Sequence, residues 1–598
     1  MEAGALPPDL ADGNADDFSV SIESILLSNG FRVETPKTGV TVIVGGNNVG
    51  KSTFLRQSSE YLRRGVGQAR NIDRWRLVSE VEVDIAGSVR DCAAWLVENH
   101  GLYYRSGLVH FGGSGPVNEH SVRLMYQFRG QEPDTFSDLF DLFALFGDPW
   151  QRVGFVQPQE MRDNIDSPAL TPIHRVEDSL ELLEEIKGIC REVFRQELTL
   201  DSMAKMIQLR VGAVDLKAPP ADAVTREYRM SVASLPPLNE QGEGMKSLIG
   251  LLLPLISALR PIVFIDEPEA FLHPPQANAL GRILGRIAKE KKIQVVLATH
   301  DKNLLTGILA SSVDTTVVRL DRSQGGESTA HQLAVDEIRE LWSDPLLKYT
   351  NVLDSLFHRL TVIGESDRDC RFYSAALGEH EPVSEIPIPA TDVLFVPAYG
   401  KSAMHKLAGA LRSIHVPTVV IPDIDILNDE ANISRLVSAV GGDWGLLRHS
   451  YDIATAQFRG QRGTPVTVGH VVAAVNSVFA GRESEPFDAK AKAELSVQLR
   501  IQESPWAELK KYGELAFRGQ SAPAAQELIG ALDDLGIVLV TVGELEGFAP
   551  SLPVAKGPAW LSAALASGAH RERPAREHIL RCVALLDRDP GRRANLPR

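Results

Sequence analysis

The chain has 598 residues, a formal net charge of −16, and ordinary fractions of apolar (44%) and charged (23%) residues. This length predicts about three or four domains, and the composition is typical of a globular protein. The negative charge does not indicate nucleic-acid binding, which favours clustered Lys and Arg, but a local basic stripe would suffice for it. The cysteines stand far apart without a CxxC pair, which argues against a zinc site or disulfide framework and favours a reducing cytosol: Cys92, Cys190, Cys370 and Cys582.

The two ends of the chain carry no chemical motif. Residues 1–17 are rich in Pro, Gly and Asp, do not resemble a signal peptide, and are expected to be disordered. The longest apolar run, Leu248 to Leu259, is too short to span a bilayer and contains Pro254. We therefore expect a soluble, cytoplasmic protein with no membrane partner. The basic tail, residues 566–598, is expected to be a solvated helix with a frayed end, and contains Arg571, Arg573, Arg576, Arg581, Arg588, Arg592, Arg593 and Arg598.

A nucleotide-binding motif follows the first strongly apolar segment. Val40 to Val44 is a β-branched run typical of a buried strand, and it leads directly into a Gly-x-x-x-x-Gly-Lys-Ser sequence. The glycines let backbone N–H groups turn toward phosphate oxygens, Lys51 reaches the β- and γ-phosphates, and Ser52 can hold Mg²⁺. The residues predicted to bind ATP here are Gly45, Asn47, Asn48, Gly50, Lys51, Ser52 and Thr53.

Two further buried strands end in polar residues that suit ATP hydrolysis. The strand Pro261 to Ile265 ends in Asp266, which would orient Mg²⁺, and Glu267, which would polarise the attacking water. The strand Ile293 to Leu297 is followed by His300. At a strand end that faces the γ-phosphate, His300 can sense that phosphate; the alternative is a structural cap.

These segments resemble the ABC-type ATPase heads of the recombination, SMC and OLD families, above all residues 266–274. Such heads have a signature loop ahead of this segment. Residues 239–247 stand at that place without a Ser-Gly-Gly run, so Gly242 and Gly244 are the candidates to contact the nucleotide of an opposing subunit. The resemblance implies at least a homodimer formed through the heads. Gln157, or alternatively Gln159, is the candidate Mg²⁺-contacting glutamine of the Q-loop, and residues of about 60–230 are expected to form an inserted lobe.

Acidic residues follow the strands of a second α/β region, which begins near Thr361. Alternating strands and helices predict a parallel sheet with helices on both faces, and carboxylates at the ends of its strands converge in one crevice. Mg²⁺ prefers oxygen ligands, and two such ions could activate water and stabilise a leaving oxygen. Alternatively, single acids here are loop residues or helix caps. The candidate metal ligands are Glu365, Asp369, Asp423 and Asp425.

This region resembles a TOPRIM domain, whose pattern is a strand, then Glu-Gly-x-x-Asp/Glu, and later Asp-x-Asp after another strand. Glu365 matches the first acid, although Ser366 replaces the glycine and leaves the tightness of that turn open. An alternative register would place Gly364 on the glycine and lose the acid. Resemblance to OLD nucleases further implies that Glu546 is a metal ligand and that Lys556 stabilises transition-state charge.

An ABC-type head joined to a TOPRIM domain is the layout of the OLD family, which the nuclease subunit of Gabija anti-phage systems shares. We therefore expect an α/β chain with a disordered N-terminus (1–17), an ATPase domain (18–345), a linker (346–358), a TOPRIM domain (359–565) and a tail (566–598). The resemblance implies an ATP- and Mg²⁺-dependent endonuclease acting on DNA in anti-phage defence or repair, with Mn²⁺ or Ca²⁺ as alternatives, and with or without a partner defence protein. The alternatives are an ATPase sensor or scaffold with an inactive TOPRIM domain, and a nuclease directed at RNA.

Overall fold

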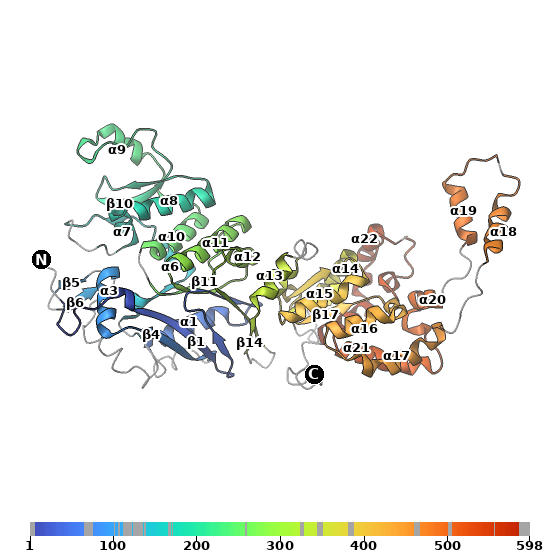
Figure 1. Ribbon diagram of the computed structural model, residues 1–598. Helices are drawn as coiled ribbons and strands as arrows, with labels where there is room; N and C mark the ends of the chain where they lie inside the picture. The colour runs from blue at the N-terminus through green and yellow to red at the C-terminus, as the bar shows by residue number, and fades with distance from the viewer. Residues whose placement is uncertain are drawn as a thin grey trace. The chain divides into compact units, whose positions relative to one another are not determined.

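The computed structural model describes most of the chain and divides it into two compact units, Met1–Asp344 and Pro345–Arg598, called here unit 1 and unit 2 (Figure 1). Each unit is described by itself. The described residues are 6–64, 76–100, 102–105, 108–111, 122, 136, 139–164, 169, 171–257, 260–322, 328–343, 351–380, 388–459, 467–482, 484–499, 505–554 and 556–584.

A six-stranded sheet forms the core of unit 1, with strand order β14-β13-β3-β12-β11-β7. Every neighbouring pair is parallel except β13 and β14. The strand before the glycine-rich loop, β3, is separated from β11 by β12 alone, so the ends of these three strands meet at one edge of the sheet. The strands are β3 (Gly39–Val44), β7 (Ala144–Gly147), β11 (Ile262–Asp266), β12 (Gln294–Ala298), β13 (Thr315–Arg322) and β14 (Ser328–Leu333).

Helices of unit 1 pack on this sheet and on each other. The pair α11 and α12 approach so closely that a Cβ atom at Gly281 would lie 2.3 Å from the carbonyl oxygen of Leu304, so only glycine fits there. The helix predicted from the apolar run 248–259 is α10, and it is buried from Ser247 to Ser257. The helices that position the site are α1 (Lys51–Arg64), α6 (Pro149–Gly154), α10 (Glu243–Ser257), α11 (Pro274–Glu290), α12 (Lys302–Ala310) and α13 (Val335–Ser343).

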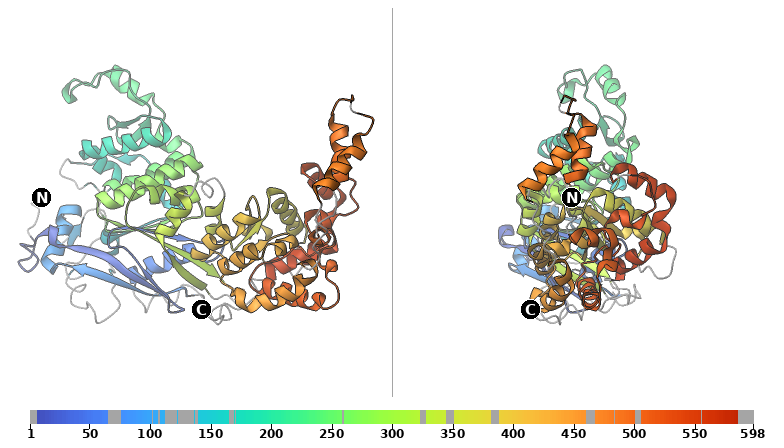
Figure 2. Two further views of the ribbon diagram at one scale, coloured as in Figure 1. Left: turned by 45° about the vertical axis from the view of Figure 1, so that its right-hand side comes forward. Right: turned by 90° about the vertical axis from the view of Figure 1, so that its right-hand side faces the viewer.

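An inserted lobe is present, but it is smaller than the predicted range of about 60–230. Strand β4 pairs with β1 in an antiparallel sheet of order β2-β1-β4, and β7 joins the main sheet beside β11. Only the later part forms a small sheet of its own, of order β8-β10-β9, beside which α7, α8 and α9 lie (Figures 1 and 2). The elements are β1 (Ser19–Leu27), β2 (Arg32–Glu34), β4 (Val78–Ala86), α3 (Val89–His100), β5 (Leu102–Arg105), β6 (Leu108–Phe111), α5 (Phe140–Phe143), β8 (Gln159–Glu160), α7 (Pro172–Asp178), α8 (Leu180–Phe194), β9 (Leu198–Asp201), β10 (Met206–Val211) and α9 (Arg226–Ala233).

The N-terminal segment is ordered from residue 6 onward, contrary to the prediction of disorder. Leu10 is 2% exposed, and the backbone N–H of Asn14 donates a 2.8 Å hydrogen bond to the carboxylate of Asp91. A short 3₁₀ helix, Ala15–Asp17, then leads into β1. A buried leucine and a long-range hydrogen bond offset the entropy cost of ordering this polar segment. Residues 1–5 lie outside the described residues.

Unit 2 is built on a parallel sheet of order β16-β15-β17, and residues 537–540 extend it through parallel bridges from Val420 to Ile537 and from Asp423 to Val540. The expected alternation of strands and helices is therefore present. The elements are β15 (Leu360–Gly364), α14 (Asp367–His380), β16 (Val393–Pro397), α15 (Lys401–Ser413), β17 (Thr418–Ile421), η7 (Ile424–Asn428), α16 (Glu430–Ala439), α17 (Trp444–Arg459), α18 (Val468–Phe479), α19 (Ala489–Leu499), α20 (Pro505–Tyr512), α21 (Ser521–Asp534), η9 (Leu545–Phe548), α22 (Pro558–Ser567) and α23 (Arg573–Val583).

Two predicted boundaries of this region are wrong, because apolar side chains outside them are buried. The 3₁₀ helix Val352–Phe357, placed in the predicted linker, buries Leu356 completely. In the predicted tail, α23 buries Ile579 in the same apolar cluster as β15, and Arg581 pairs with Asp533 at 2.7 Å. Residues 566–584 thus complete the core of unit 2. Residues 346–350 and the arginines from Arg588 onward lie outside the described residues.

Two properties of the whole chain complete the description. The cysteines are buried as free thiols. Within the described residues, no helix combines the length and the apolar character needed to cross a bilayer.

Candidate functional site

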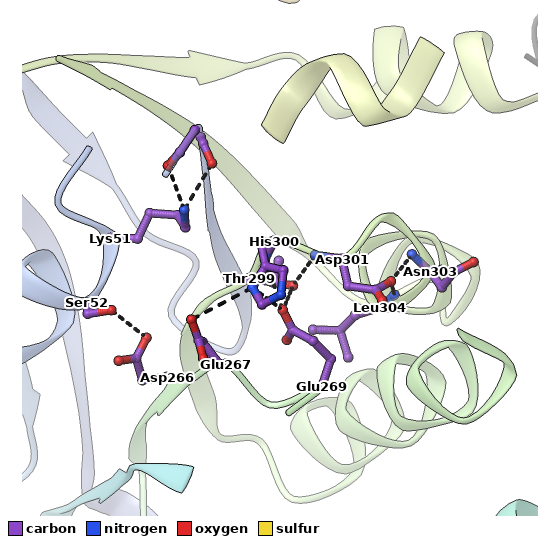
Figure 3. Close-up of polar contacts among 12 residues, drawn as sticks. Lys51, Ser52, Asp266, Glu267, Glu269, Thr299, His300, Asp301, Asn303 and Leu304 are labelled. Atoms are coloured by element: carbon purple, nitrogen blue, oxygen red, sulfur yellow. Dashed lines mark hydrogen bonds and ion pairs between the residues drawn. The ribbon is translucent and has the colours of Figure 1, made fainter. Parts of the chain in front are cut away.

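The glycine-rich loop of unit 1 is shaped to receive phosphates. Gly45 has a φ of 146°, and a Cβ there would lie 2.3 Å from the carbonyl oxygen of Leu320, so no other residue fits. The Lys51 ammonium, at the start of α1, folds over the loop and donates to the carbonyl oxygens of Gly45 at 3.0 Å and Gly46 at 2.8 Å (Figure 3). Burial lowers the pKa of Lys51, although nearby carboxylates oppose the shift. An anion at this place would relieve that cost of burial.

The loop and the strand β11 are joined by one side-chain contact. The hydroxyl of Ser52 donates to the Asp266 carboxylate at 3.1 Å (Figure 3), across 214 residues of sequence. Burial raises the pKa of Asp266, as expected for a carboxylate that lacks a full positive partner. A hydroxyl and a carboxylate beside a phosphate site are the oxygen ligands that Mg²⁺ uses. Asn47 and Asn48 are exposed on the same loop, and Thr53 is half-buried on α1.

The two other predicted hydrolytic residues also face each other. The His300 ring nitrogen Nδ1 lies 3.8 Å from the Glu267 carboxylate, and both side chains are about half exposed, at 52% and 46%. Glu267 has a φ of 45°, an uncommon conformation for a residue other than glycine. Its backbone N–H donates to the carbonyl oxygen of Ala298 at 3.0 Å, which ties β11 to the end of β12. The strand ends thus place both groups beside the loop.

Glu269 has a role that the sequence did not assign. It is 5% exposed and accepts hydrogen bonds from the Thr299 hydroxyl at 2.7 Å and the His300 backbone N–H at 2.9 Å (Figure 3). The His300 ring nitrogen Nδ1 lies 3.2 Å from the same carboxylate. Glu269 therefore fixes the loop that presents His300. The motif contained this acid, but only the fold shows what it touches.

Arg152, on α6, is a residue of the site that no sequence motif indicated. Its side chain is fully buried and donates to the carbonyl oxygens of Gly147 at 3.1 Å, Glu267 at 3.0 Å and Asp266. Burial lowers its pKa to about 10. A Cβ at Gly250 of α10 would lie 2.0 Å from the Arg152 carbonyl oxygen, so α10 packs directly on this arginine. A lone arginine outside any motif gives no signal in one sequence.

The predicted Q-loop and signature residues lie against each other. The amide of Gln157 donates to the carbonyl oxygen of Val153 at 3.2 Å and accepts from the Asn239 amide at 3.5 Å, while Gln159 donates to the Gln157 carbonyl oxygen at 3.0 Å. These bonds hold the glutamine to the segment before α10. The predicted Mg²⁺ contact of Gln157 stays a prediction.

Packing within the chain explains the absence of a side chain at one of the two signature glycines. A Cβ at Gly244 would lie 2.6 Å from the Phe271 carbonyl oxygen, whereas a Cβ at Gly242 would have nothing within 4 Å. Gly242 accepts the backbone hydrogen bonds that open α10, from Met245 and Lys246. Their predicted contact with an opposing subunit stays a prediction.

In unit 2, the strand ends place the predicted carboxylates in one region. Glu365 follows β15 directly, and Asp423 follows β17. Asp369 lies in the first turn of α14, where its carboxylate accepts from the Ser366 backbone N–H at 2.8 Å and from the Ser366 hydroxyl at 2.5 Å. Ser366 does not have a positive φ, so this turn does not require the glycine of the family pattern. Asp425 lies in η7.

The electrostatics show that these carboxylates lie close together. Burial, followed by the charge of Glu365, raises the pKa of Asp423 to about 8. Burial also raises the pKa of Glu365, with a smaller contribution from Asp369 and Asp425. The Oε2 atom of Glu365 is buried and accepts no hydrogen bond from the described residues. A carboxylate oxygen without a hydrogen bond, 3.7 Å from the Lys401 ammonium and among mutually repelling acids, fits a divalent cation, which prefers such hard oxygen ligands.

The side chains do not, however, close around a single ion as they stand. Within the described part of the chain, no group of three or more His, Cys, Asp or Glu residues is arranged to hold a metal. Lys401 gives the physical reason: its ammonium forms ion pairs with Asp425 and, at 3.7 Å, with Glu365. The lysine thus supplies the positive charge that the acids require.

The last two predicted residues have partners that the sequence did not indicate. Glu546 lies 3.5 Å from the Arg368 guanidinium. Lys556 is paired with Glu544, which also lies 3.5 Å from the Lys510 ammonium. Lys401, Lys510 and Glu544 are therefore site residues that sequence reasoning missed.

Comparisons with known proteins relate parts of the chain to an AAA domain and to OLD nucleases. The family described as "AAA domain, putative AbiEii toxin, Type IV TA system" matches residues 162–306. The chain is 26% identical over 178 residues to the Old nuclease of Escherichia phage P2, covering 28% of each chain. It is 25% identical over 269 residues to the OLD nuclease of Thermus scotoductus, covering 41% of this chain and 47% of that one.

Each match to these relatives therefore spans less than half of the relative's length. Among solved structures, the SMC head domain from Thermotoga maritima aligns with 53% of this chain and 98% of its own, at 14% identity and a TM-score of 0.27, which is too low to add to the topology described above. The glycine-rich loop, the sheet order of unit 1 and the family match agree on a P-loop ATPase fold. The resemblance expected from the motifs is confirmed: part of the chain is similar to the OLD nucleases, and unit 1 has a P-loop ATPase fold.

Proposed function

We propose that this chain is an OLD-type endonuclease that binds and hydrolyses ATP, uses divalent metal ions, and cleaves DNA. The observation that carries the nuclease part is the half-buried carboxylate group after β15 and β17, in which Oε2 of Glu365 accepts no hydrogen bond from the described residues. Buried acids at neighbouring strand ends are costly for stability, and they serve a function when metal ions bind them.

The ATPase step follows from the contacts in unit 1. Lys51 and the amides of the loop would bind the β- and γ-phosphates in place of the carbonyl bonds that Lys51 makes now. Ser52 and Asp266 would hold Mg²⁺, and Glu267 would orient the attacking water. His300, fixed by Glu269, would contact the γ-phosphate. Gly242 and Gly244 would complete the site of a partner head, so the active form is a homodimer or a higher oligomer.

The nuclease step is assigned to unit 2, which we propose is a TOPRIM domain. Glu365, Asp369, Asp423, Asp425 and Glu546 would hold Mg²⁺, with Mn²⁺ or Ca²⁺ as alternatives. Bound divalent ions polarise a phosphodiester and supply a nucleophilic water at neutral pH. Lys556, which pairs with Glu544, would stabilise the charge of the transition state.

The biological setting is proposed from the family resemblance. OLD-type proteins suggest anti-phage defence or DNA repair in the cytoplasm, with or without a partner defence protein. A second candidate function is an ATPase sensor whose unit 2 acts through a partner, which the ion pairs of Lys401 with Glu365 and Asp425 favour, since these acids already have a cation. RNA is the alternative target of an active nuclease.

A substrate panel tests these candidates. Purified protein is incubated with supercoiled plasmid, linear DNA and tRNA, in Mg²⁺ or Mn²⁺, with and without ATP, beside Lys51→Ala. We expect cleavage of at least one DNA substrate, and loss of ATP hydrolysis in Lys51→Ala. Cleavage of tRNA alone would move the target to RNA. ATP hydrolysis without cleavage of any substrate would favour the sensor.

A further inference from the structure

Lysines and carboxylates alternate along one line in unit 2. Glu365 lies 3.7 Å from Lys401, which also pairs with Asp425. Asp425 in turn lies 3.5 Å from Lys510, and Lys510 lies 3.5 Å from Glu544, which pairs with Lys556. We call the residues Glu365, Lys401, Asp425, Lys510, Glu544 and Lys556 the charge ladder.

The lysines of the charge ladder come from separate segments and become more exposed along it. Lys401 opens α15, Lys510 lies in the last turn of α20, and Lys556 precedes α22 (Figure 1). Their side chains are 22%, 42% and 57% exposed. The ladder therefore runs from the buried carboxylates that we propose as metal ligands toward solvent. Because these lysines are far apart in the sequence, it is the fold that brings them into one line.

Lys401 pairs with Glu365 and Asp425, which we propose as metal ligands, whereas Lys510 pairs with Asp425 and with Glu544, which is not a proposed ligand. Burial opposes the charge of Lys510, yet Asp425 and Glu544 outweigh that cost and raise its pKa. A carboxylate that binds a divalent cation has little negative potential left for an ammonium group. Lys401 would then be a half-buried cation in need of an anion, and Lys510 would keep Glu544 alone, at a place where the proposed substrate carries one phosphate per nucleotide.

An exposed aromatic ring stands beside the inner end of the ladder. Tyr399 is 75% exposed and has a φ of 55°, which is unusual for a bulky residue. It precedes Gly400, whose N–H donates to the Glu365 carbonyl oxygen at 3.0 Å, and Lys401. An exposed ring next to a row of cations is the arrangement by which proteins bind a single strand, with bases on the ring and phosphates on the lysines.

We propose that Lys401 and Lys510, with Tyr399, form a binding track for a single nucleic-acid strand, and that this track opens when divalent ions bind the carboxylates of the ladder. The lysines then exchange carboxylate partners for backbone phosphates. This inference rests on the proposed function, since it uses the same carboxylates. It adds that strand binding requires metal before any bond is cleaved.

The test measures binding rather than cleavage. Fluorescence anisotropy is recorded with a labelled single-stranded DNA oligonucleotide, and with RNA of the same sequence, in EDTA or in Ca²⁺ with intact length checked on a gel. We expect the wild type to bind at least about tenfold more tightly in Ca²⁺ than in EDTA. A difference between DNA and RNA identifies which strand the track prefers.

Lysine variants separate this track from a general effect of charge. Lys401→Met and Lys510→Met should weaken binding in Ca²⁺ and each reduce the slope of log affinity against log salt by about one. Lys511→Met is the matched control: it removes the same charge from the neighbouring position of α20, where the exposed Lys511 lies 5.1 Å from the Tyr512 ring. Tyr399→Ala should weaken binding about fivefold or more without changing the salt slope.

A metal titration distinguishes failure of this inference from failure of the proposed function. Mn²⁺ binding is measured by calorimetry without nucleic acid; Lys401→Met should bind the ion more tightly than the wild type, because the competing cation is gone. A wild type that binds no divalent ion in unit 2 would overturn the proposed function. Normal metal binding, with Lys401→Met and Lys510→Met indistinguishable from Lys511→Met in strand binding, would overturn the track alone. Thermal unfolding of each variant confirms that it is folded.

Discussion

Replacing Arg152 by methionine should impair ATP hydrolysis while leaving ATP binding nearly intact. The Arg152 guanidinium bonds the backbone of Asp266 and Glu267, whose side chains we assign to Mg²⁺ and to the attacking water. Lys51 and Ser52, which we assign to the phosphates and the ion, bond Gly45, Gly46 and Asp266 through their side chains and not Arg152. Arg152 therefore positions the residues that we assign to hydrolysis and does not bind the nucleotide itself.

The structure sets the expected size of this effect. A hydrogen bond from a charged donor to a buried carbonyl contributes about 1.5 kcal/mol, so losing the bonds to Asp266 and Glu267 removes about 3 kcal/mol. The positive φ of Glu267 costs about 1–3 kcal/mol and persists only while its surroundings enforce it. If these bonds act on the conformation of Glu267, kcat should fall about 100-fold, since each 1.4 kcal/mol corresponds to tenfold.

The assay compares two arginines that bond backbone carbonyls. Arg175 donates to the carbonyl oxygens of Asn99 at 3.2 Å and Ser257 at 3.1 Å, away from the ATP site. Arg175→Met should lower the thermal unfolding temperature but leave kcat within about threefold, while Arg152→Met should lower both and leave the Kd of a fluorescent ATP analogue within about threefold. Arg152→Lys should recover part of kcat. Equal kcat for Arg152→Met and Arg175→Met would refute the reasoning.

Three further predictions concern packing, pH and the turn at Ser366. Gly250→Ala places a Cβ 2.0 Å from the Arg152 carbonyl oxygen, so it should lower kcat more than Gly188→Ala, whose Cβ meets nothing within 4 Å; equal rates would contradict this. Burial lowers the pKa of His578 to about 3 in the folded chain, compared with about 6.5 for an unfolded histidine. Between these two pH values only the unfolded chain takes up a proton, so the stability of the fold falls as the pH drops from about 6.5 toward 3. Urea unfolding of unit 2 in the full chain should therefore show a loss at pH 5 of about 2 kcal/mol that His578→Phe lacks; an equal loss in both would be evidence against a buried neutral imidazole. Ser366→Gly removes the hydroxyl bond to Asp369 but keeps the backbone bond, so Mn²⁺ affinity should change less than about fivefold, and complete loss of binding would show that the hydroxyl is essential.

The sequence was sufficient where a motif is local and where strands are strongly apolar. The glycine-rich loop, Asp266 and His300 each follow a buried strand, and parallel pairing of these strands then brings them to one edge. The same reasoning placed Glu365 and Asp423 after β15 and β17. It was wrong for the segments 6–17, 352–357 and 566–584, where a few apolar residues stand within polar stretches. In α23 the buried residues do follow a helical spacing, but the many arginines of the segment suggested a solvated helix.

The residues that the sequence missed act through tertiary contacts. Arg152 reaches Glu267 across 115 positions, and Lys510 reaches Asp425 from a different helix. A lone basic residue in a polar segment is indistinguishable from a solvated one until the fold gives it a partner. At Ser366, the sequence departs from the family pattern but the structure accommodates the change. The backbone there has no positive φ that would require glycine, and the Ser366 hydroxyl donates to Asp369.

The most direct test of the account is plasmid cleavage by the wild type and Glu365→Gln at equal Mg²⁺ or Mn²⁺, with ATP hydrolysis measured in the same samples. Glutamine keeps the shape of Glu365 but removes the charge that would bind a cation. The account predicts nicked or linear DNA with the wild type, intact plasmid with Glu365→Gln, and the same ATPase rate for both. Equal cleavage by Glu365→Gln would contradict the assignment of the metal-binding carboxylates in unit 2.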